Sequence, residues 1–109
     1  MILIIRRKAT DKEITQMAED FSGYIKVVVD IEREILVGGG ERHYQAEEKL
    51  LEDGSSQANL WGGGTDWETK EIDYNSIINL RPNQDNPSRD ILSLGIRKKF
   101  DMIMKKLLL

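Results

Sequence analysis

The stretch from residue 24 to residue 40, YIKVVVDIEREILVGGG, constrains the fold of this chain more than any other. Its first eight residues alternate between two faces, which is the period-2 pattern of a half-buried β-strand. The apolar face of that strand is formed by Ile25, Val27, Val29 and Ile31. The charged segment 30–34 predicts a turn, and residues 34–37 predict a returning strand. The whole stretch therefore predicts a β-hairpin that ends in a glycine triplet.

Helical patterns stand on both sides of this hairpin. In TDKEITQMAEDFSG, Thr10 and Glu13 have the spacing of a capping box, and Gly23 marks the stop. A second helix is predicted over residues 42–53, with Gly54 as its C-terminal stop. The C-terminal segment predicts an amphipathic helix that leaves most of its lysines off its apolar stripe. That stripe is formed by Leu92, Ile96, Phe100, Ile103 and Leu107.

Three further segments complete the predicted order of elements. The short apolar run MILIIRR predicts a central strand covered on both faces. Residues 54–70 contain four glycines and both tryptophans, and they predict a long connection in which ANLW adds a short edge strand. The alternation in EIDYNSIINLRP predicts a strand over residues 71–81 that Pro82 ends.

The predicted order β-α-β-β-α-(β)-β-α indicates an α+β fold. Two βαβ-like halves joined through a hairpin are typical of a ferredoxin-like split βαβ sandwich, or of a related sheet with helices on one face. Here a C-terminal amphipathic helix is added. Because the chain has 109 residues and no linker or repeat, we expect a single domain over residues 1–109.

The composition excludes several classes of function. The chain has no cysteine, which rules out disulfides, thiolate nucleophiles and iron–sulfur ligation. The net charge of −3 counts against generic nucleic-acid binding. The N-terminus lacks the charge order of a signal peptide, and no apolar run is long enough to span a bilayer. We therefore expect a cytoplasmic protein without membrane association.

The glycine triplet at residues 38–40 is the first candidate for chemistry. Glycines before a helix start can present backbone N–H groups to an anion, at the positive end of the helix dipole. Neither the Walker loop nor the dinucleotide-binding fingerprint is completed, and Glu41 places a negative charge there. The alternative is a strand-to-helix corner that needs positive φ.

The only histidine, His43, is the second candidate. It borders the buried stripe of its helix, and Glu47 follows one turn later. The pair fits a structural histidine, an acid/base pair or a metal site. A single histidine with carboxylates is a thin ligand set for zinc, so we expect no metal ion and no cofactor.

A polar run around the predicted strand 71–81 supplies candidate ligand-binding residues. A guanidinium fork and carboxamides suit a carboxylate or a phosphate, although the same residues are ordinary turn formers. Trp61 lies in the preceding connection, where its ring either closes the core or contributes to a site. The candidates are Asn79, Arg81, Asn83, Asn86 and Trp61.

The stretch from residue 24 to residue 62, the run YNSIINLRPNQDN and the basic last helix together resemble a family of small prokaryotic proteins described as a domain of unknown function. The resemblance covers nearly the whole chain. Its most specific parts are residues 39–43, 53–55, 60–62 and 78–82. It implies a compact stand-alone bacterial or archaeal protein and no particular activity.

Two classes of function follow. The first is a binding or interaction module of unknown ligand, with another protein or a second copy of the chain as partner. The alternative is a small hydrolytic or phosphoryl-directed enzyme. It would use His43 and Glu47 as acid/base, with Arg81 and Asn79 as anion binders, and it requires His43 and Arg81 to face one cleft. RNA binding through the basic last helix is disfavoured by the acidic total charge.

Overall fold

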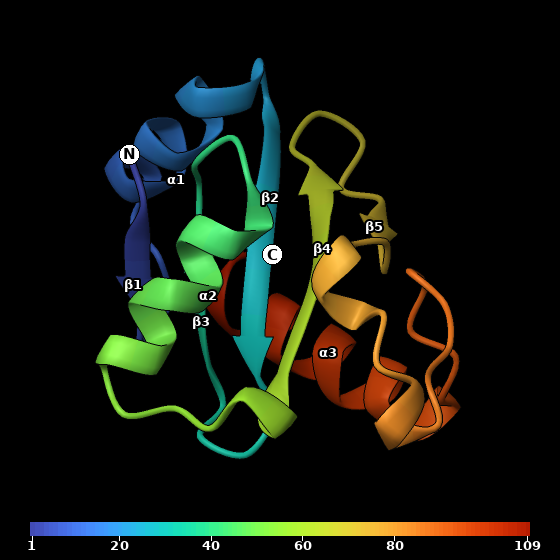
Figure 1. Cartoon of the computed structure of the whole chain (residues 1–109). Helices are drawn as coiled ribbons and strands as arrows, with labels where there is room; N and C mark the ends of the chain where they lie inside the picture. The colour runs from blue at the N-terminus through green and yellow to red at the C-terminus, as the bar shows by residue number, and fades with distance from the viewer.

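The predicted hairpin forms the centre of a five-stranded sheet in the computed structural model, which describes residues 1–109 (Figure 1). The hairpin strands are β2 (Tyr24–Asp30) and β3 (Ile35–Gly38). The strand order is β1-β3-β2-β4-β5, and every pair of neighbours is antiparallel. The outer strands are β1 (Leu3–Ile5), β4 (Leu60–Asp66) and β5 (Ile72–Asp73).

Three helices cover the two faces of this sheet (Figure 1). Helices α1 (Asp11–Ala18) and α3 (Leu94–Leu107) pack against one face, in a core that includes the odd-numbered β2 residues from Ile25 to Val29. Helix α2 (His43–Glu52) packs against the other face, over Val28. None of the three helices has the length and apolar character needed to cross a membrane.

The helix predictions are largely confirmed. Thr10 and Glu13 form the capping box, because each side chain accepts a hydrogen bond from the backbone N–H of the other. Helix α2 lies within the predicted residues 42–53. Helix α3 begins after Ser93, whose hydroxyl accepts from the N–H of Ile96, so Leu92 lies outside the helix.

The α+β class and the order of elements are confirmed, but the expectation of helices on one face is wrong. A ferredoxin-like sheet would place β4 beside β1, whereas here β4 lies beside β2. The crossovers β1–α1–β2 and β3–α2–β4 therefore both move across the sheet toward the β5 edge. Strands β1 and β2 run in one direction, and strands β3 and β4 run in the opposite direction. Because such crossovers are right-handed, they place α1 and α2 on opposite faces.

Strand β1 is an edge strand, so the prediction of a central strand is wrong. Its side chains nevertheless contact apolar residues on both faces: Ile2 and Ile4 pack against the α2 core, and Leu3 and Ile5 belong to the other core. A continuous apolar run indicates that both faces of a strand are covered. It does not indicate whether both edges of the strand are hydrogen-bonded to neighbours.

The glycine-rich connection contains β4, a seven-residue strand that pairs with β2 along its whole length. The sequence predicted only a short edge strand here, because three consecutive glycines weaken any strand pattern. The glycines are needed because neighbouring segments of the chain approach β4 closely. A Cβ on Gly62 would lie 2.6 Å from the Cβ of Ser76, and one on Gly63 would overlap the carbonyl of Asp73.

Only two residues of the strand predicted over 71–81 form β5, and a 3-10 turn, η3 (Ile77–Asn79), follows. Two side chains from this region instead take the place of a neighbouring strand along β4. The Asn79 side chain accepts from the N–H of Gly62 (2.8 Å) and donates to its carbonyl (2.9 Å). The Arg81 guanidinium donates to the carbonyls of Leu60 and Gln57. The polar groups of this strand edge are thereby satisfied inside the protein.

Candidate functional site

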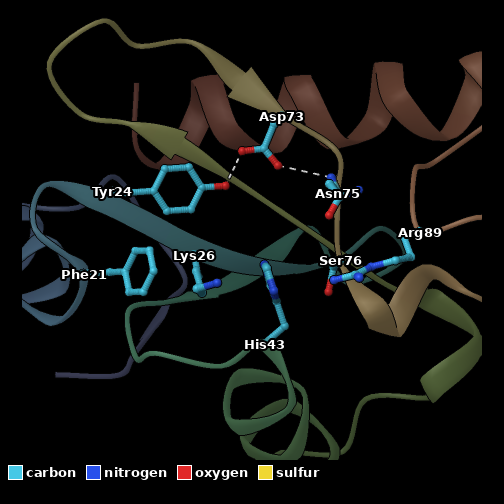
Figure 2. Close-up of a pocket in the computed structure, with 8 residues that line it drawn as sticks. All are labelled: Phe21, Tyr24, Lys26, His43, Asp73, Asn75, Ser76 and Arg89. Carbon is cyan, nitrogen blue, oxygen red and sulfur yellow. Dashed lines mark hydrogen bonds between the residues drawn. The ribbon is translucent and has the colours of Figure 1, made fainter.

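A pocket of about 360 Å³ opens on the α2 side of the sheet, beyond the start of α2 (Figure 2). Its walls come from β2, the first residue of α2, β5 and the segment before α3. The two apolar residues that line it are Phe21 and Tyr24. The polar residues that line it are Lys26, His43, Asp73, Asn75, Ser76 and Arg89.

Sheet register brings three of these positions into one row. Lys26 of β2 lies opposite Gly64 of β4, which in turn lies opposite Asp73 of β5. Because residues paired across an antiparallel sheet share a face, Lys26 and Asp73 project to the same side. Gly64 has no side chain, and the ring of Tyr24 occupies the space that a Cβ there would fill. The glycine therefore makes room for the Tyr24 ring on the floor of the pocket.

Tyr24 and Asp73 form a hydrogen-bonded pair across this floor (Figure 2). The Tyr24 hydroxyl donates to one carboxylate oxygen of Asp73, and the backbone N–H of Asn75 donates to the other at 3.1 Å. Burial first, and then the hydrogen bond to the carboxylate, raise the pKa of Tyr24 well above its usual value. Tyr24 is thus a permanent donor to Asp73, and both Asp73 oxygens are engaged.

Lys26 and Arg89 are the two cations of the pocket. No carboxylate lies within ion-pair distance of either side chain. The Lys26 ammonium lies 4.6 Å from the centre of the Phe21 ring. The Arg89 backbone is fixed because its carbonyl accepts from Ser76 N–H and from the Asn79 carboxamide, both at 3.0 Å. The pocket therefore has excess positive charge on well-anchored chain segments.

His43, the first residue of α2, points its ring toward β4 (Figure 2). Its Nε2 lies 2.7 Å from the carbonyl oxygen of Gly63. Since a carbonyl only accepts, Nε2 carries the proton, and the neutral ring keeps its lone pair on Nδ1. Burial chiefly lowers the pKa of His43, and the charges of Lys26 and Arg89 lower it further. The hydrogen bond to Gly63 and the Asp73 charge oppose this shift, and the lowered pKa favours the neutral ring.

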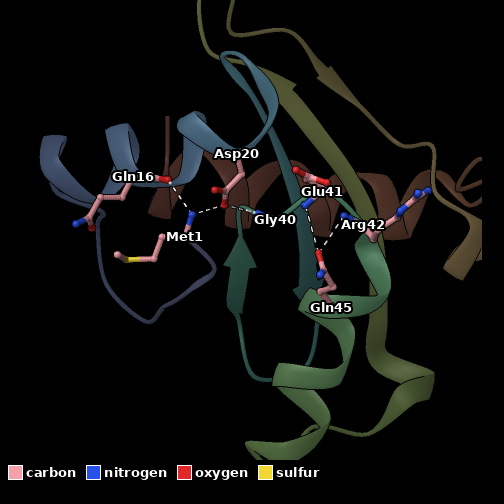
Figure 3. A network of polar contacts seen from close by, with 7 residues as sticks. All are labelled: Met1, Gln16, Asp20, Gly40, Glu41, Arg42 and Gln45. Atoms are coloured by element: carbon pink, nitrogen blue, oxygen red, sulfur yellow. Dashed lines mark hydrogen bonds and ion pairs between the residues drawn. The ribbon is translucent and has the colours of Figure 1, made fainter.

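The glycine triplet before α2 is a corner, as the structural interpretation predicted (Figure 3). Gly39 and Gly40 have φ of +97° and +82°, which glycine adopts without strain. The N–H of Gly40 donates to the Asp20 carboxylate at 2.7 Å, beside the amino group of Met1. The next two N–H groups donate to the Gln45 side chain. The chain itself thus occupies the donors that an anion would use.

The structure does not bring His43 and Arg81 into one cleft. Arg81 is 8% exposed, its guanidinium carbon lies 4.0 Å from the centre of the Trp61 ring, and it does not line the pocket. Burial lowers the pKa of Arg81, and the charge of Glu47 opposes that shift. The charge of Glu47 therefore affects Arg81. One carboxylate oxygen of Glu47 is buried without a hydrogen-bond partner. The geometric condition for the predicted enzyme site is not met by these residues.

The other predicted ligand-binding residues also lie outside the pocket. Asn79 is fully buried at the edge of β4. Asn86 is buried, and its carboxamide binds four backbone groups of the segment 79–92. Trp61 belongs to the core under α3, and Asn83 is exposed. Asn79 influences the pocket indirectly, because its carboxamide fixes the chain at Arg89.

Sequence reasoning identified His43 but missed Tyr24, Lys26 and Asp73 as members of a site. Tyr24 and Lys26 alternate with the buried residues of β2, a pattern equally typical of a solvated strand face. The missing information was the pairing of β2 with a glycine strand and of that strand with β5. Arg89 lies in the polar segment after the predicted strand 71–81, where the sequence does not distinguish it from the neighbouring turn residues.

Residues 3–107 match the family with the description "Protein of unknown function (DUF5674)". The match covers nearly the whole chain, as the sequence resemblance predicted. No curated protein and no solved structure shows significant similarity to the chain.

Proposed function

We propose that this chain, which belongs to that family of proteins of unknown function, is a binding module for a small anionic ligand. The ligand occupies the pocket between β2, β5 and the start of α2. One observation carries the proposal: Lys26 and Arg89 line the pocket without a carboxylate partner, while both oxygens of Asp73 are already hydrogen-bonded. An anion between the two cations would balance this charge.

The donors in the pocket suit an oxyanion. The Arg89 guanidinium offers a planar fork that matches carboxylate and phosphate geometry, and Lys26 adds a mobile point charge. The Ser76 hydroxyl accepts from the N–H of Ile78 at 3.3 Å, which leaves its own hydrogen to donate. A volume of about 360 Å³ lies at the lower end of small-molecule sites, which favours a small ligand.

Calorimetric titration with sodium sulfate and sodium phosphate tests this proposal. We expect saturable binding to the unaltered protein, and a loss of affinity of about tenfold or more in Lys26→Ala and in Arg89→Ala. Lys12→Ala is the matched control, because it removes the same charge from an exposed position on α1, which packs on the other face of the sheet. Absence of binding, or equal weakening in all three variants, would contradict the proposal.

A phosphoryl-directed enzyme in the same pocket is the second candidate. The observation that favours it is the lone pair on His43 Nδ1, which has no hydrogen-bond partner within the protein. Lys26 and Arg89 would then take the part that the sequence assigned to Arg81 and Asn79. Hydrolysis of p-nitrophenyl phosphate that is lost in His43→Gln would support catalysis, whereas sulfate binding without turnover would support the binding module.

Two expectations from the sequence stay predictions beside this proposal. The first is a cytoplasmic location. The second is an assembly with another protein or with a second copy of the chain, which light scattering at increasing protein concentration would detect as a rise in mass.

A further inference from the structure

The charges that face His43 come from several elements. Lys26 on β2 and Arg89 before α3 are positive, and Asp73 on β5 is negative. On its own helix, Glu47 lies one turn further, and its charge opposes the burial that lowers the pKa of Arg81. Asp90 is exposed and accepts from the Asn75 side chain at 3.0 Å. The three charges that line the pocket therefore sum to +1 with a neutral imidazole and to +2 with a protonated one.

His43 can take up a proton without losing its place in the fold. Its Nε2–H donates to Gly63 in the neutral and in the charged ring alike, because both forms keep the hydrogen on that nitrogen. The second proton would go to Nδ1, which has no partner in the protein. Burial and the positive charges of Lys26 and Arg89 make this protonation unfavourable. A bound anion would offset those two charges.

We infer that, given the anion binding proposed above, the pocket selects a dianionic group of the phosphate monoester type over a monoanion, and that His43 Nδ1 takes up one proton when the dianion binds. Charge balance leads to this choice. A monoanion neutralises the pocket when His43 is neutral, whereas a dianion neutralises it only when His43 is protonated. The imidazolium is then a third positive group, beside the ammonium and the guanidinium.

The sign of the pH dependence follows from linkage. In the free protein His43 loses its proton at a lower pH than an ordinary histidine, and a bound dianion shifts that loss to higher pH. Affinity for the dianion therefore rises as the pH falls between these two values, by up to about tenfold per pH unit. Sulfate is the cleanest probe, because it stays dianionic while the second ionisation of a phosphate monoester occurs near pH 6.

The experiment uses the fact that His43 is the only histidine, so its ring gives a single set of proton NMR signals. The signals are followed from pH 4.5 to 8.5 in the free protein, with saturating sodium sulfate, and with saturating methyl sulfate, a monoanion, at matched ionic strength. We expect sulfate to raise the pKa of His43 by about one pH unit or more and methyl sulfate to change it little.

A variant and a pair of ligands sharpen this test. In His43→Gln the amide nitrogen can still donate to Gly63 but takes up no proton, so its sulfate affinity should be independent of pH. Inorganic phosphate and phenyl phosphate separate two sources of the same group. Tighter binding of phenyl phosphate would point to an organic ester that rests on Phe21, a residue that is 47% exposed. Equal binding of the two ligands would point to free phosphate.

The outcomes separate this inference from the proposed function. If sulfate binds while the pKa of His43 stays unchanged, or if methyl sulfate binds as tightly, the dianion inference fails and anion binding stands. If His43→Gln keeps the pH dependence, the proton goes elsewhere and the inference also fails. If none of the four anions binds at any pH, the proposed function itself is overturned.

Discussion

The most informative perturbation of the fold is Asn79→Ala, because this side chain forms both hydrogen bonds that a neighbouring strand would make with Gly62 of β4. Asn79 is fully buried. Its oxygen accepts from Gly62 N–H at 2.8 Å, and its nitrogen donates to the carbonyls of Gly62, Tyr74 and Arg89 at 2.9 to 3.0 Å. The change leaves both polar groups of Gly62 without partners inside the protein. It also releases the chain at Arg89, on the wall of the pocket.

The size of the effect follows from these contacts. Each buried backbone group left without a partner costs about 1–3 kcal/mol, so the two groups of Gly62 alone account for about 2–6 kcal/mol. We expect a loss of about 3–5 kcal/mol in the free energy of unfolding, which is a large part of the roughly 5–15 kcal/mol that holds a domain of this size.

Urea unfolding followed by tryptophan fluorescence measures this loss, since Trp61 is the neighbour of Gly62 in β4 and is buried. Asn83→Ala is the matched control: it removes the same group from an exposed residue nearby, and we expect a change within about 0.5 kcal/mol. A loss below about 1 kcal/mol in Asn79→Ala would refute the role of this side chain as a substitute for a strand.

Two other predictions concern the glycines of β4 and the response to acid. Gly63→Ala should lower the melting temperature, because its Cβ would overlap the Asp73 carbonyl and contact the Phe100 ring at 2.8 Å. In Gly95→Ala the added Cβ would only make an ordinary contact with the Ser93 hydroxyl at 3.6 Å, so this change should raise stability by about 0.4–1 kcal/mol. The reverse order of melting temperatures would contradict this account of the glycines. Hydrogen bonds from Arg6 and Arg33 hold the pKa of Asp53 below its usual value, so its contribution to stability is present above about pH 4 and is lost as the pH falls through the lowered value. Asp53→Asn should therefore flatten the acid limb of a stability–pH curve, and an unchanged limb would show that the Asp53 carboxylate and its two arginine partners contribute nothing there.

Local sequence patterns predicted the helices well, because the signals that begin and end a helix lie within a few residues. The capping box of Thr10 and Glu13 was readable directly. The strands were harder. Alternation over residues 71–81 predicted a strand, but its polar side chains turn inward to satisfy the edge of β4. No local pattern distinguishes a side chain that replaces a strand from one that faces solvent.

The candidate site was predictable only in part, for the same physical reason. His43 was found because it is the only histidine and begins a helix. Its partners depend on sheet register, which places Lys26, Gly64 and Asp73 in one row across three strands. The sequence offered Arg81 as the cation, but β4 needs that guanidinium for its own carbonyls. Which arginine is available to a ligand is decided by tertiary structure.

A titration of ¹⁵N-labelled protein with sulfate, followed by amide chemical shifts, tests the claim that Lys26, His43 and Arg89 form an anion site. We predict saturable shifts with one dissociation constant at the amides of Lys26, Asn75 and Arg89 and in the His43 ring. The lysines of α3 should show no saturable shift. Saturable shifts confined to those lysines, or changes everywhere that do not saturate, would contradict the claim.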